Sequence, residues 1–422
     1  MRQLHEVKEE TEKIILVSVA QNVNDDTEEC LDELEELAET AGAVVLAKVI
    51  QNRESIHPGT YIGKGKIQEV KEMVAELGAT GVVCDDELSP AQIHNLEEAL
   101  EVKVIDRTVM ILDIFAQRAS TREGKIQVEL AQLKYRSSRL IGLGKSLSRL
   151  GGGIGTRGPG EKKLEMDRRL IRDRISQLKK ELEEVKQNRA TTRKQRKANA
   201  VPVVSIVGYT NAGKSTLLNA LTDANVLAED KLFATLDPTT RNVTLERGQH
   251  ILLTDTVGFI RKLPHHLVDA FKSTLEEAKY ADILLHVVDA SNPSADAHMH
   301  TVYETLRNLG VEDKTIITLF NKQDKLENAE VILKDGQADK VLKISAKMKQ
   351  GLDDVLHAIE LILQERKIYV ETTISYQDAG VLQLIRKYGQ LLKEEYQEGG
   401  IAIEAYIPKE IYHKVMLENH NS

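Results

Sequence analysis

The segment Gly208–Ser215 is the feature that constrains this chain most. It reads GYTNAGKS, which fits G-x-x-x-x-G-K-[ST], and it lies inside 201–221, a buried apolar run followed by a helical segment. A strand, a glycine loop and a helix in this order wrap phosphate groups with backbone N–H groups and a helix N-terminus. We therefore expect an α/β fold with a phosphate-binding loop, formed by Gly208, Tyr209, Thr210, Asn211, Ala212, Gly213, Lys214, Ser215 and Thr216.

Two residues of this loop have the chemistry to act on the phosphates. Lys214 would bridge the β- and γ-phosphates of a bound nucleotide, and the Ser215 hydroxyl would be a ligand of Mg²⁺. A second buried strand, 251–255, runs into Asp255, Thr256, Val257 and Gly258. Asp255 would hold Mg²⁺ through water, and the Gly258 N–H would meet the γ-phosphate. This D-x-x-G pattern is weak alone and becomes specific because it follows a phosphate-binding loop.

Two further buried strands, 282–289 and 315–320, precede the motif that would choose the base. Asp324 can accept hydrogen bonds from guanine N1–H and the 2-amino group. Adenine offers no matching donors, so a buried carboxylate without partners would penalise ATP. Lys322 would lie along the base and Asn321 would tie this loop to the phosphate loop. The pattern predicts a guanine site formed by Asn321, Lys322, Gln323, Asp324, Ser345, Ala346 and Lys347.

A mobile loop is expected between the phosphate loop and the D-x-x-G strand. Such a loop gives one threonine to Mg²⁺ when the γ-phosphate is present, and this makes it a switch. Thr235 is our assignment, and Thr239 or Thr240 is the competing one. The expected nucleotide contacts of this loop are Phe233, Ala234, Thr235, Leu236 and Asp237.

The chain divides into four expected domains. Residues 1–117 alternate short β-rich runs with helical ones, which predicts a small parallel α/β domain. Residues 118–200 form a basic helical hairpin with a glycine-rich loop and a linker at 191–202, standing off the globular parts. The nucleotide domain spans 201–365, and a small β-α-β domain, 366–422, closes the chain.

Charge is distributed unevenly along this chain. The net charge is −9, yet residues 118–200 hold 23 Lys/Arg and nine Asp/Glu, a local net charge of +14. A basic segment on an acidic protein favours a phosphate backbone as its partner. No apolar run approaches the length of a membrane span, and Cys30 and Cys84 form no disulfide or metal pattern. The start lacks the features of a secretion signal. We expect a cytoplasmic monomer.

These motifs resemble the HflX family of ribosome-associated GTPases, which belongs to the same superfamily as Obg. The resemblance covers nearly the whole chain, and its most distinctive segments are 57–70, 122–135, 147–165, 208–219 and 233–241. It implies GTP hydrolysis with Mg²⁺, binding to the large ribosomal subunit, and separation of ribosomal subunits under stress. Contact with rRNA would involve the glycine-rich tip with Arg149, Arg157, Lys162 and Lys163.

The expected catalytic residues are Lys214, Thr235 and Gly258, and they leave one role unfilled. Many GTPases have a glutamine directly after D-x-x-G to orient the attacking water, whereas this chain has Phe259. We expect slow intrinsic turnover that a ribosome accelerates. Asn211 has two open interpretations: a ligand of K⁺, as in similar GTPases, or a residue suited to a tight turn.

Two other function classes compete with a ribosome-bound switch. One is a GTPase that acts directly on RNA as a remodelling or modification factor. The other is a less specific NTPase whose N-terminal domain binds a nucleotide of its own, although the first 120 residues contain no phosphate-loop motif. The C-terminal domain contains no chemical motif, and we expect a docking surface there.

Overall fold

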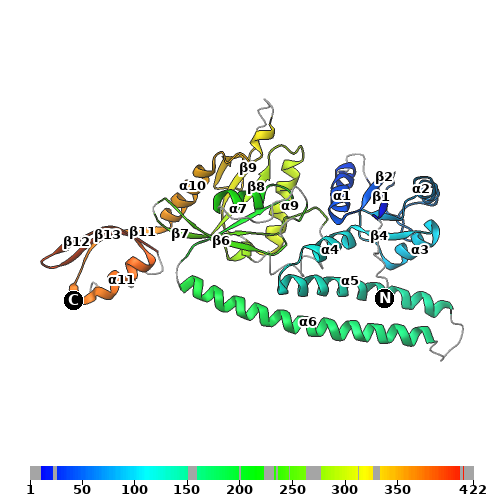
Figure 1. Ribbon diagram of the computed structural model, residues 1–422, viewed down its shortest axis with the longest axis horizontal. Helices are drawn as coiled ribbons and strands as arrows, with labels where there is room; N and C mark the ends of the chain where they lie inside the picture. Colours follow the sequence, from blue (N-terminus) through cyan, green and yellow to red (C-terminus); the bar gives the residue numbers. More distant parts are fainter. Residues whose placement is uncertain are drawn as a thin grey trace, which may run out of the picture. The chain divides into compact units, whose positions relative to one another are not determined.

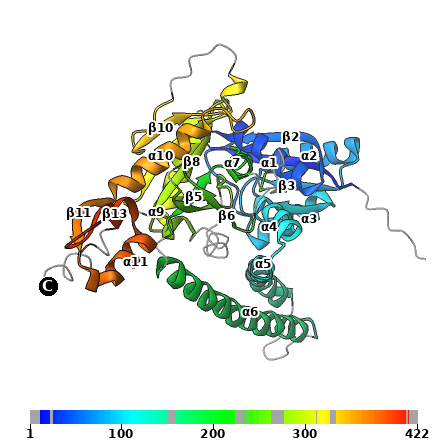
Figure 2. The ribbon, with the colours of Figure 1, turned by 60° about the vertical axis from the view of Figure 1, so that its left-hand side comes forward.

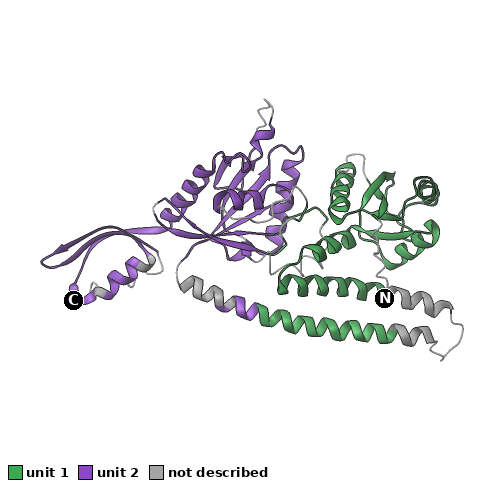
Figure 3. Cartoon of the chain, viewed as in Figure 1, with its two compact units in different colours: residues 1–185, 229–237, 257–275 green, residues 186–228, 238–256, 276–422 purple. Residues whose placement is uncertain are grey.

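The computed structural model describes residues 11–21, 26–150, 159–198, 201–222, 232–233, 236–246, 248–262, 277–311, 313–326, 333–408 and 412. The chain divides into two compact units (Figure 3). Unit 1 comprises residues 1–185, 229–237 and 257–275, and unit 2 comprises residues 186–228, 238–256 and 276–422. Two short segments from the nucleotide half of the sequence therefore belong to the N-terminal unit.

A four-stranded parallel sheet forms the centre of unit 1. Its strands follow the order β2-β1-β3-β4, with bounds β1 (Lys13–Ala20), β2 (Val44–Asn52), β3 (Gly81–Cys84) and β4 (Lys103–Asp106). The connecting helices are α1 (Thr27–Ala41), α2 (Lys64–Leu77) and α3 (Pro90–Leu100). Helix α2 packs against α3, and α1 packs against α4 (Arg107–Arg118) (Figure 1). The expected parallel α/β domain is confirmed, and Cys30 and Cys84 are buried free thiols within it.

Local sequence signals set the ends of these helices. The Ser89 hydroxyl accepts a hydrogen bond from the Gln92 N–H, and the Gln92 side chain accepts one from the Ser89 N–H. This reciprocal capping box, with Pro90 at the first helical position, starts α3. Helix α1 ends at Gly42, whose φ of 91° is left-handed and is accessible to glycine without strain.

The basic hairpin consists of α5 (Arg122–Leu150) and α6 (Pro159–Ala198). Ion pairs Arg122–Glu181 and Arg174–Glu129 show that the two helices run antiparallel, as expected. The middle of α5 packs on the N-terminal sheet, because Tyr135 donates to Asp106 at the end of β4 at 2.8 Å. The hairpin therefore does not stand off the globular part along its whole length.

The linker expected at 191–202 was partly wrong. Helix α6 continues to Ala198, so most of the basic segment after residue 190 is helical. Arginine, lysine, glutamine and alanine favour helices, and the segment contains no glycine or proline before Pro202 that would stop one. The glycine-rich loop at 151–158 lies outside the described residues, and so does Arg157.

Unit 2 contains a six-stranded sheet of order β10-β9-β8-β5-β7-β6, in which only β6 is antiparallel to its neighbour. Its bounds are β5 (Val203–Gly208), β6 (Thr239–Thr244), β7 (His250–Asp255), β8 (Ile283–Asp289), β9 (Thr315–Asn321) and β10 (Lys340–Lys343). Helices α7 (Lys214–Thr222) and α10 (Leu352–Glu365) share one core with the sheet, and α9 (Ala295–Asn308) belongs to a second. This arrangement brings the phosphate loop and the base motif to the carboxyl ends of parallel strands, where α/β folds bind ligands.

A separate small sheet ends the described chain. It has the order β11-β13-β12, and all its pairs are antiparallel. The elements are β11 (Lys367–Ile374), a 3₁₀ turn (Tyr376–Asp378), α11 (Ala379–Tyr388), β12 (Gln390–Gln397) and β13 (Gly400–Pro408). The expected β-α-β arrangement was incomplete, because it omitted β13. The Glu398-Gly399 turn makes a hairpin of β12 and β13, and such a glycine-containing turn permits tight strand reversal.

Among the described residues, no helix is both long enough and apolar enough to cross a membrane.

Candidate nucleotide-binding site

The phosphate loop requires glycine at both of its ends. Strand β5 ends at Gly208 with a φ of 154°, and Gly213 precedes α7 with a φ of 95°. A Cβ atom on Gly208 would lie 2.3 Å from the Val287 carbonyl oxygen. A Cβ atom on Gly213 would lie 2.3 Å from Asn321 Nδ2. Side chains are therefore excluded at both positions, and the backbone of the loop turns tightly over the ends of β5 and β8.

Asn211 lies at the turn of this loop. Its φ of 58° is left-handed, a conformation that asparagine tolerates better than most residues. The left-handed turn by itself explains why asparagine occupies this position. The tip of the loop also packs laterally, because the Tyr209 ring stacks on His298 of α9 with a centroid distance of 3.8 Å. The loop is thus held in shape by its glycines, its asparagine and this stacked pair.

Lys214 is buried at the first position of α7. Its ammonium group donates to the Tyr209 carbonyl oxygen at 2.6 Å, so the side chain folds back over the loop. Burial lowers the pKa of Lys214 to about 8, and Asp255 opposes this shift. Bound phosphates would supply the negative charge that stabilises the protonated form. Lys214 is therefore positioned to bind an anion in a buried site where its positive charge is otherwise unfavourable.

This depressed pKa predicts proton uptake on nucleotide binding. Near pH 8.5, roughly three quarters of Lys214 would be neutral in the free protein, and bound phosphates would raise its pKa and protonate it. GTP binding should therefore take up most of one proton at pH 8.5 and almost none at pH 6.5. Calorimetric titration in two buffers with different ionisation enthalpies measures this uptake. Equal uptake at the two pH values would contradict the assignment.

An oxygen pair beside Lys214 has the chemistry of a magnesium site. The Ser215 hydroxyl donates to Asp255 Oδ2 at 2.7 Å, and Asp255 is fully buried at the end of β7. The Thr256 hydroxyl donates to the Ile206 carbonyl oxygen at 2.7 Å and fixes the end of this strand against β5. Hydroxyl and carboxylate oxygens suit Mg²⁺, which takes few protein ligands when a nucleotide supplies phosphate oxygens. The described residues include no cluster of three or more His, Cys, Asp or Glu side chains that could hold a metal ion.

Asn321 joins the base motif to the phosphate loop. Its Nδ2 donates to the Ala212 carbonyl oxygen at 2.9 Å, and its Oδ1 accepts from the Ala346 N–H at 2.9 Å. One buried amide thus connects 208–215, 321–324 and 345–347, which are far apart in the sequence. Strands β5, β8 and β9 bring these segments together in the structure.

The carboxylate expected to read the base is accessible. Asp324 is exposed and not buried, and it accepts a hydrogen bond from the Ser345 hydroxyl at 2.5 Å, which lowers the pKa of the carboxyl group. Lys322 has a left-handed φ of 62° and pairs with Asp289 at 2.8 Å. Ser345 and Ala346 are buried, Lys347 is exposed, and the Gln323 amide donates to the Phe320 carbonyl oxygen. The carboxylate is thus ionised and oriented before any base covers it.

The described part of the first switch loop belongs to unit 1. The Phe233 ring packs edge-on against Phe115, with centroids 4.7 Å apart. Asp237 accepts hydrogen bonds from the N–H and hydroxyl groups of both Ser120 and Thr121, at 2.5 to 3.0 Å. These two residues immediately precede α5, so the carboxylate also lies where a helix N-terminus favours negative charge. Leu236 is buried beside them.

The metal-ligand assignment within this loop stays a prediction. Ala234 and Thr235 lie outside the described residues. Of the competing threonines, Thr240 shares a hydrogen bond of 3.0 Å with Thr254 on the neighbouring strand. Thr239 is half-buried at the start of β6.

The segment after D-x-x-G is also anchored in unit 1. Phe259 and Ile260 are each 2% exposed. Lys262, with a left-handed φ of 52°, pairs with Asp85 at 2.5 Å and with Asp86 at 2.8 Å. Arg261 pairs with Glu29 at 3.0 Å. Phe259, which stands where many GTPases have glutamine, is therefore buried in a segment that Arg261 and Lys262 tie to unit 1.

Asp85 is a buried centre of charge that sequence reasoning missed. Its carboxylate is fully buried and accepts from Arg107 at 2.7 Å as well as from Lys262. Burial raises the pKa of Asp85 to about 6, and Lys262 opposes the shift. The only sequence signal was a charged residue directly after the apolar strand β3, and that pattern is common.

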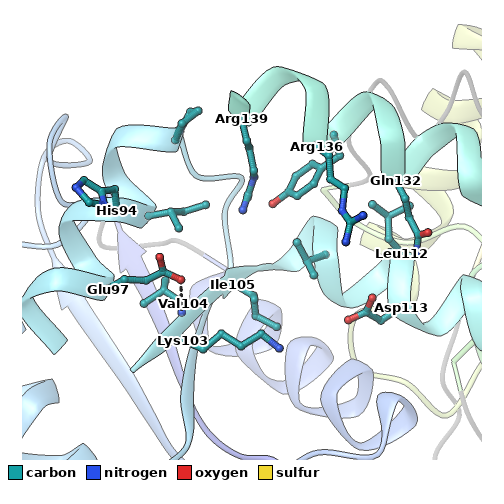
Figure 4. A pocket seen from close by; sticks show the side chains of 14 residues that line it. His94, Glu97, Lys103, Val104, Ile105, Leu112, Asp113, Gln132, Arg136 and Arg139 are labelled. Carbon is teal, nitrogen blue, oxygen red and sulfur yellow. Dashed lines mark hydrogen bonds between the residues drawn. The ribbon is translucent and has the colours of Figure 1, made fainter. Parts of the chain in front are cut away.

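A cavity of about 480 Å³ lies elsewhere in unit 1, lined by residues of α3, β4, α4 and α5 (Figure 4). Arg136 and Arg139 approach it from one side, and Glu97, Lys103 and Asp113 lie on the other (Figure 4). None of its 14 lining residues is a glycine, so it has no phosphate loop of the kind found at 208–215. The cavity gives no support to a second nucleotide site of that type.

The fold and the site define the class of protein. A six-stranded sheet with a phosphate loop after β5, a buried aspartate after β7 and a guanine motif after β9 is a P-loop GTPase domain. Family models agree along the chain: "GTP-binding GTPase N-terminal" matches residues 28–116, "GTP-binding GTPase Middle Region" matches 118–196, and "50S ribosome-binding GTPase" matches 203–322.

Relatives identify the family within this class. The chain is 67% identical to a GTPase HflX of Lacrimispora saccharolytica, over 98% of this chain and 97% of the relative. It is 51% identical to a GTPase HflX of Caldanaerobacter subterraneus, over 97% of this chain and 94% of the relative. A solved structure, the SsGBP and GDP complex, is 27% identical with a TM-score of 0.48, covering 84% of this chain and 99% of that one. The chain belongs to the HflX family of GTPases, and it binds and hydrolyses GTP.

Proposed function

We propose that this GTPase binds the large ribosomal subunit in the cytoplasm and uses its GTP cycle to separate or rescue ribosomes. The observation that carries the proposal is the match of its nucleotide domain to the 50S ribosome-binding GTPase model. The basic hairpin supports it, because a net charge of +14 on an acidic chain suits a partner rich in phosphate. The protein would act as a monomer.

The site residues have separate roles in GTP hydrolysis. Lys214 binds the β- and γ-phosphates, and the loop backbone between Gly208 and Gly213 surrounds them. Ser215 and Asp255 would hold Mg²⁺, with Thr235 joining them when the γ-phosphate is present. The ion, when bound, would neutralise charge that develops on the phosphate oxygens. Asp324 selects guanine at the other end of the site.

A group other than the residue after D-x-x-G must orient the attacking water. Phe259 is buried and has no donor or acceptor in its side chain. We propose that intrinsic hydrolysis is slow and that the large subunit accelerates it by ordering the switch segments. A K⁺ ion at Asn211 would be a different source of assistance, whereas the left-handed turn needs no ion. Equal hydrolysis rates in K⁺ and Na⁺ buffers would favour the turn.

Substitutions in the basic hairpin provide the first test of ribosome binding. Replacing Arg149, Arg157, Lys162 and Lys163 together by alanine should weaken binding to large subunits and make it less dependent on salt. Each phosphate contact contributes about 0.7 to 0.9 to the slope of log affinity against log salt concentration. Co-sedimentation with large subunits across a salt series measures both effects. Arg169 and Arg172, which are exposed on α6 outside the glycine-rich tip, supply a control with half the change in charge when replaced by alanine.

A GTPase that acts directly on RNA remains the alternative. The hairpin charge suits rRNA in either case, so the charge alone does not separate them. Binding to protein-free rRNA as tight as binding to intact subunits would favour the RNA factor. A strong preference for intact subunits would favour the proposed function.

A further inference from the structure

The C-terminal sheet has one covered face and one open face. Helix α11 packs its apolar side chains, among them Val381 and Ile385, against the inward residues of β11 and β13. Figure 1 shows α11 on a single side of this sheet, and Figure 2 shows the same elements from another direction. Side chains alternate across a strand. The opposite, open face therefore carries Lys367, Tyr369, Glu371, Lys393, Glu395, Glu404 and Tyr406.

Two glutamates of this open face oppose each other directly. Glu371 on β11 and Glu404 on β13 are register partners. Like charges in this position destabilise an antiparallel pair. Lys393 on β12 is the register partner of Glu404 and also pairs with Glu395 of its own strand at 2.9 Å, so one ammonium group serves two carboxylates. Three glutamates thus face Lys393 and Lys367, and the ammonium group of Lys367 donates to Gln249. The open face therefore retains an excess of negative charge, which a cationic ligand would relieve.

Two tyrosines lie beside these glutamates. Tyr369 and Tyr406 are the adjacent register partners, and their rings meet edge-on with a centroid distance of 5.4 Å. Tyr369 is 46% exposed. Exposed aromatic rings bind Arg and Lys side chains through cation–π contacts, and carboxylates bind the same groups by charge-assisted hydrogen bonds. The opposed carboxylates would repel the phosphate backbone of a nucleic acid.

We propose that this acidic, aromatic face, Tyr369, Glu371, Glu404 and Tyr406, binds a basic segment of a large-subunit protein and not rRNA. The inference rests on the proposed function. It assigns the two contacts between this chain and the large subunit to different chemistries. The basic hairpin meets phosphate, and the C-terminal face meets Arg and Lys side chains. None of the three family models that match the chain extends into 366–422, so this contact lies outside the matched domains.

Charge reversal on the face tests the inference. The full-length E371K/E404K variant should bind purified large subunits about tenfold or more weakly, because like charges would then meet across the interface. E365K/E398K makes the same change in net charge at exposed positions away from the face, and it should bind like the wild type or more tightly. Neither variant should alter intrinsic GTP hydrolysis. The single variant E371K places Lys opposite Glu404, so its melting temperature should not fall.

A photo-crosslinker distinguishes the two possible partners. With benzoylphenylalanine in place of Tyr369, irradiation on purified large subunits should link the chain to a basic segment of a ribosomal protein, identified by mass spectrometry. Crosslinking to 23S rRNA, or E371K/E404K binding as tightly as E365K/E398K, would overturn the inference. Failure of the wild-type protein to bind large subunits would instead remove the proposed function on which the inference rests.

Discussion

Replacing Lys214 by alanine is expected to abolish measurable GTP hydrolysis and to weaken GTP binding by about two to four orders of magnitude. The estimate follows from losing two charged hydrogen bonds to phosphate, each contributing ~1.5–3 kcal/mol. The ammonium group lies inside the loop that surrounds the phosphates, donating at 2.6 Å to the Tyr209 carbonyl oxygen. Fluorescent GTP titration and phosphate release measure the two losses.

The same substitution should not destabilise the free protein. Burial lowers the pKa of Lys214, which means that the folded protein disfavours its charged form. Removing the group therefore removes an unfavourable burial of charge, and the melting temperature of the nucleotide-free protein should hold or rise. Lys334, which is exposed, gives a matched control when replaced by alanine. GTP affinity close to that of this control would show that Lys214 does not bind phosphate.

Replacing Asp324 by asparagine is expected to exchange one base preference for another. The variant should lose about 100-fold in GTP affinity, because a charged acceptor of two guanine N–H groups is replaced by a neutral amide. Xanthine nucleotides should bind the variant better than the wild type, because xanthine has a carbonyl oxygen where guanine has the 2-amino group and the amide N–H can donate to it. Competition titrations with guanosine, xanthosine and adenosine triphosphates measure the exchange.

The structure provides a control for this second prediction. Asp313 is exposed and has a left-handed φ of 55°, which asparagine adopts readily, so Asp313→Asn should fold and keep the preference for GTP. Asp324→Asn should leave intrinsic phosphate chemistry intact at saturating xanthosine triphosphate. An unchanged GTP preference in Asp324→Asn would show that another group reads the base.

The parts of the site that the sequence predicts are those encoded locally. Gly208 and Gly213 precede and follow a loop whose length and glycine positions are a recognisable pattern, and the structure shows why no side chain fits there. Ser89 and Gly42 likewise set helix ends through their own neighbours. Alternation of strands and helices was sufficient to predict the parallel sheet of the N-terminal domain. The Glu398-Gly399 hairpin turn was not predicted, and the expectation of β-α-β omitted the strand that follows it.

The contacts of the switch segments could not be predicted from the sequence. Asp237 meets Thr121 across 116 residues, and Lys262 meets Asp85 across 177. Nothing local marks these pairs, because each is a charged residue in a polar loop or at the end of a strand. Phe259 shows the same limit: the sequence reveals a missing glutamine, and only the structure shows that the phenylalanine is buried.

GTP hydrolysis with and without purified large ribosomal subunits is the most direct test of the central claim. The proposed function predicts slow release of phosphate by the protein alone and a rate at least about tenfold higher with saturating subunits, since a partner that orders the switch segments supplies what Phe259 cannot. Lys214→Ala should remain inactive under both conditions. An unchanged rate together with no co-sedimentation would leave a GTPase of the HflX family whose partner is not the large subunit, and would contradict the proposal.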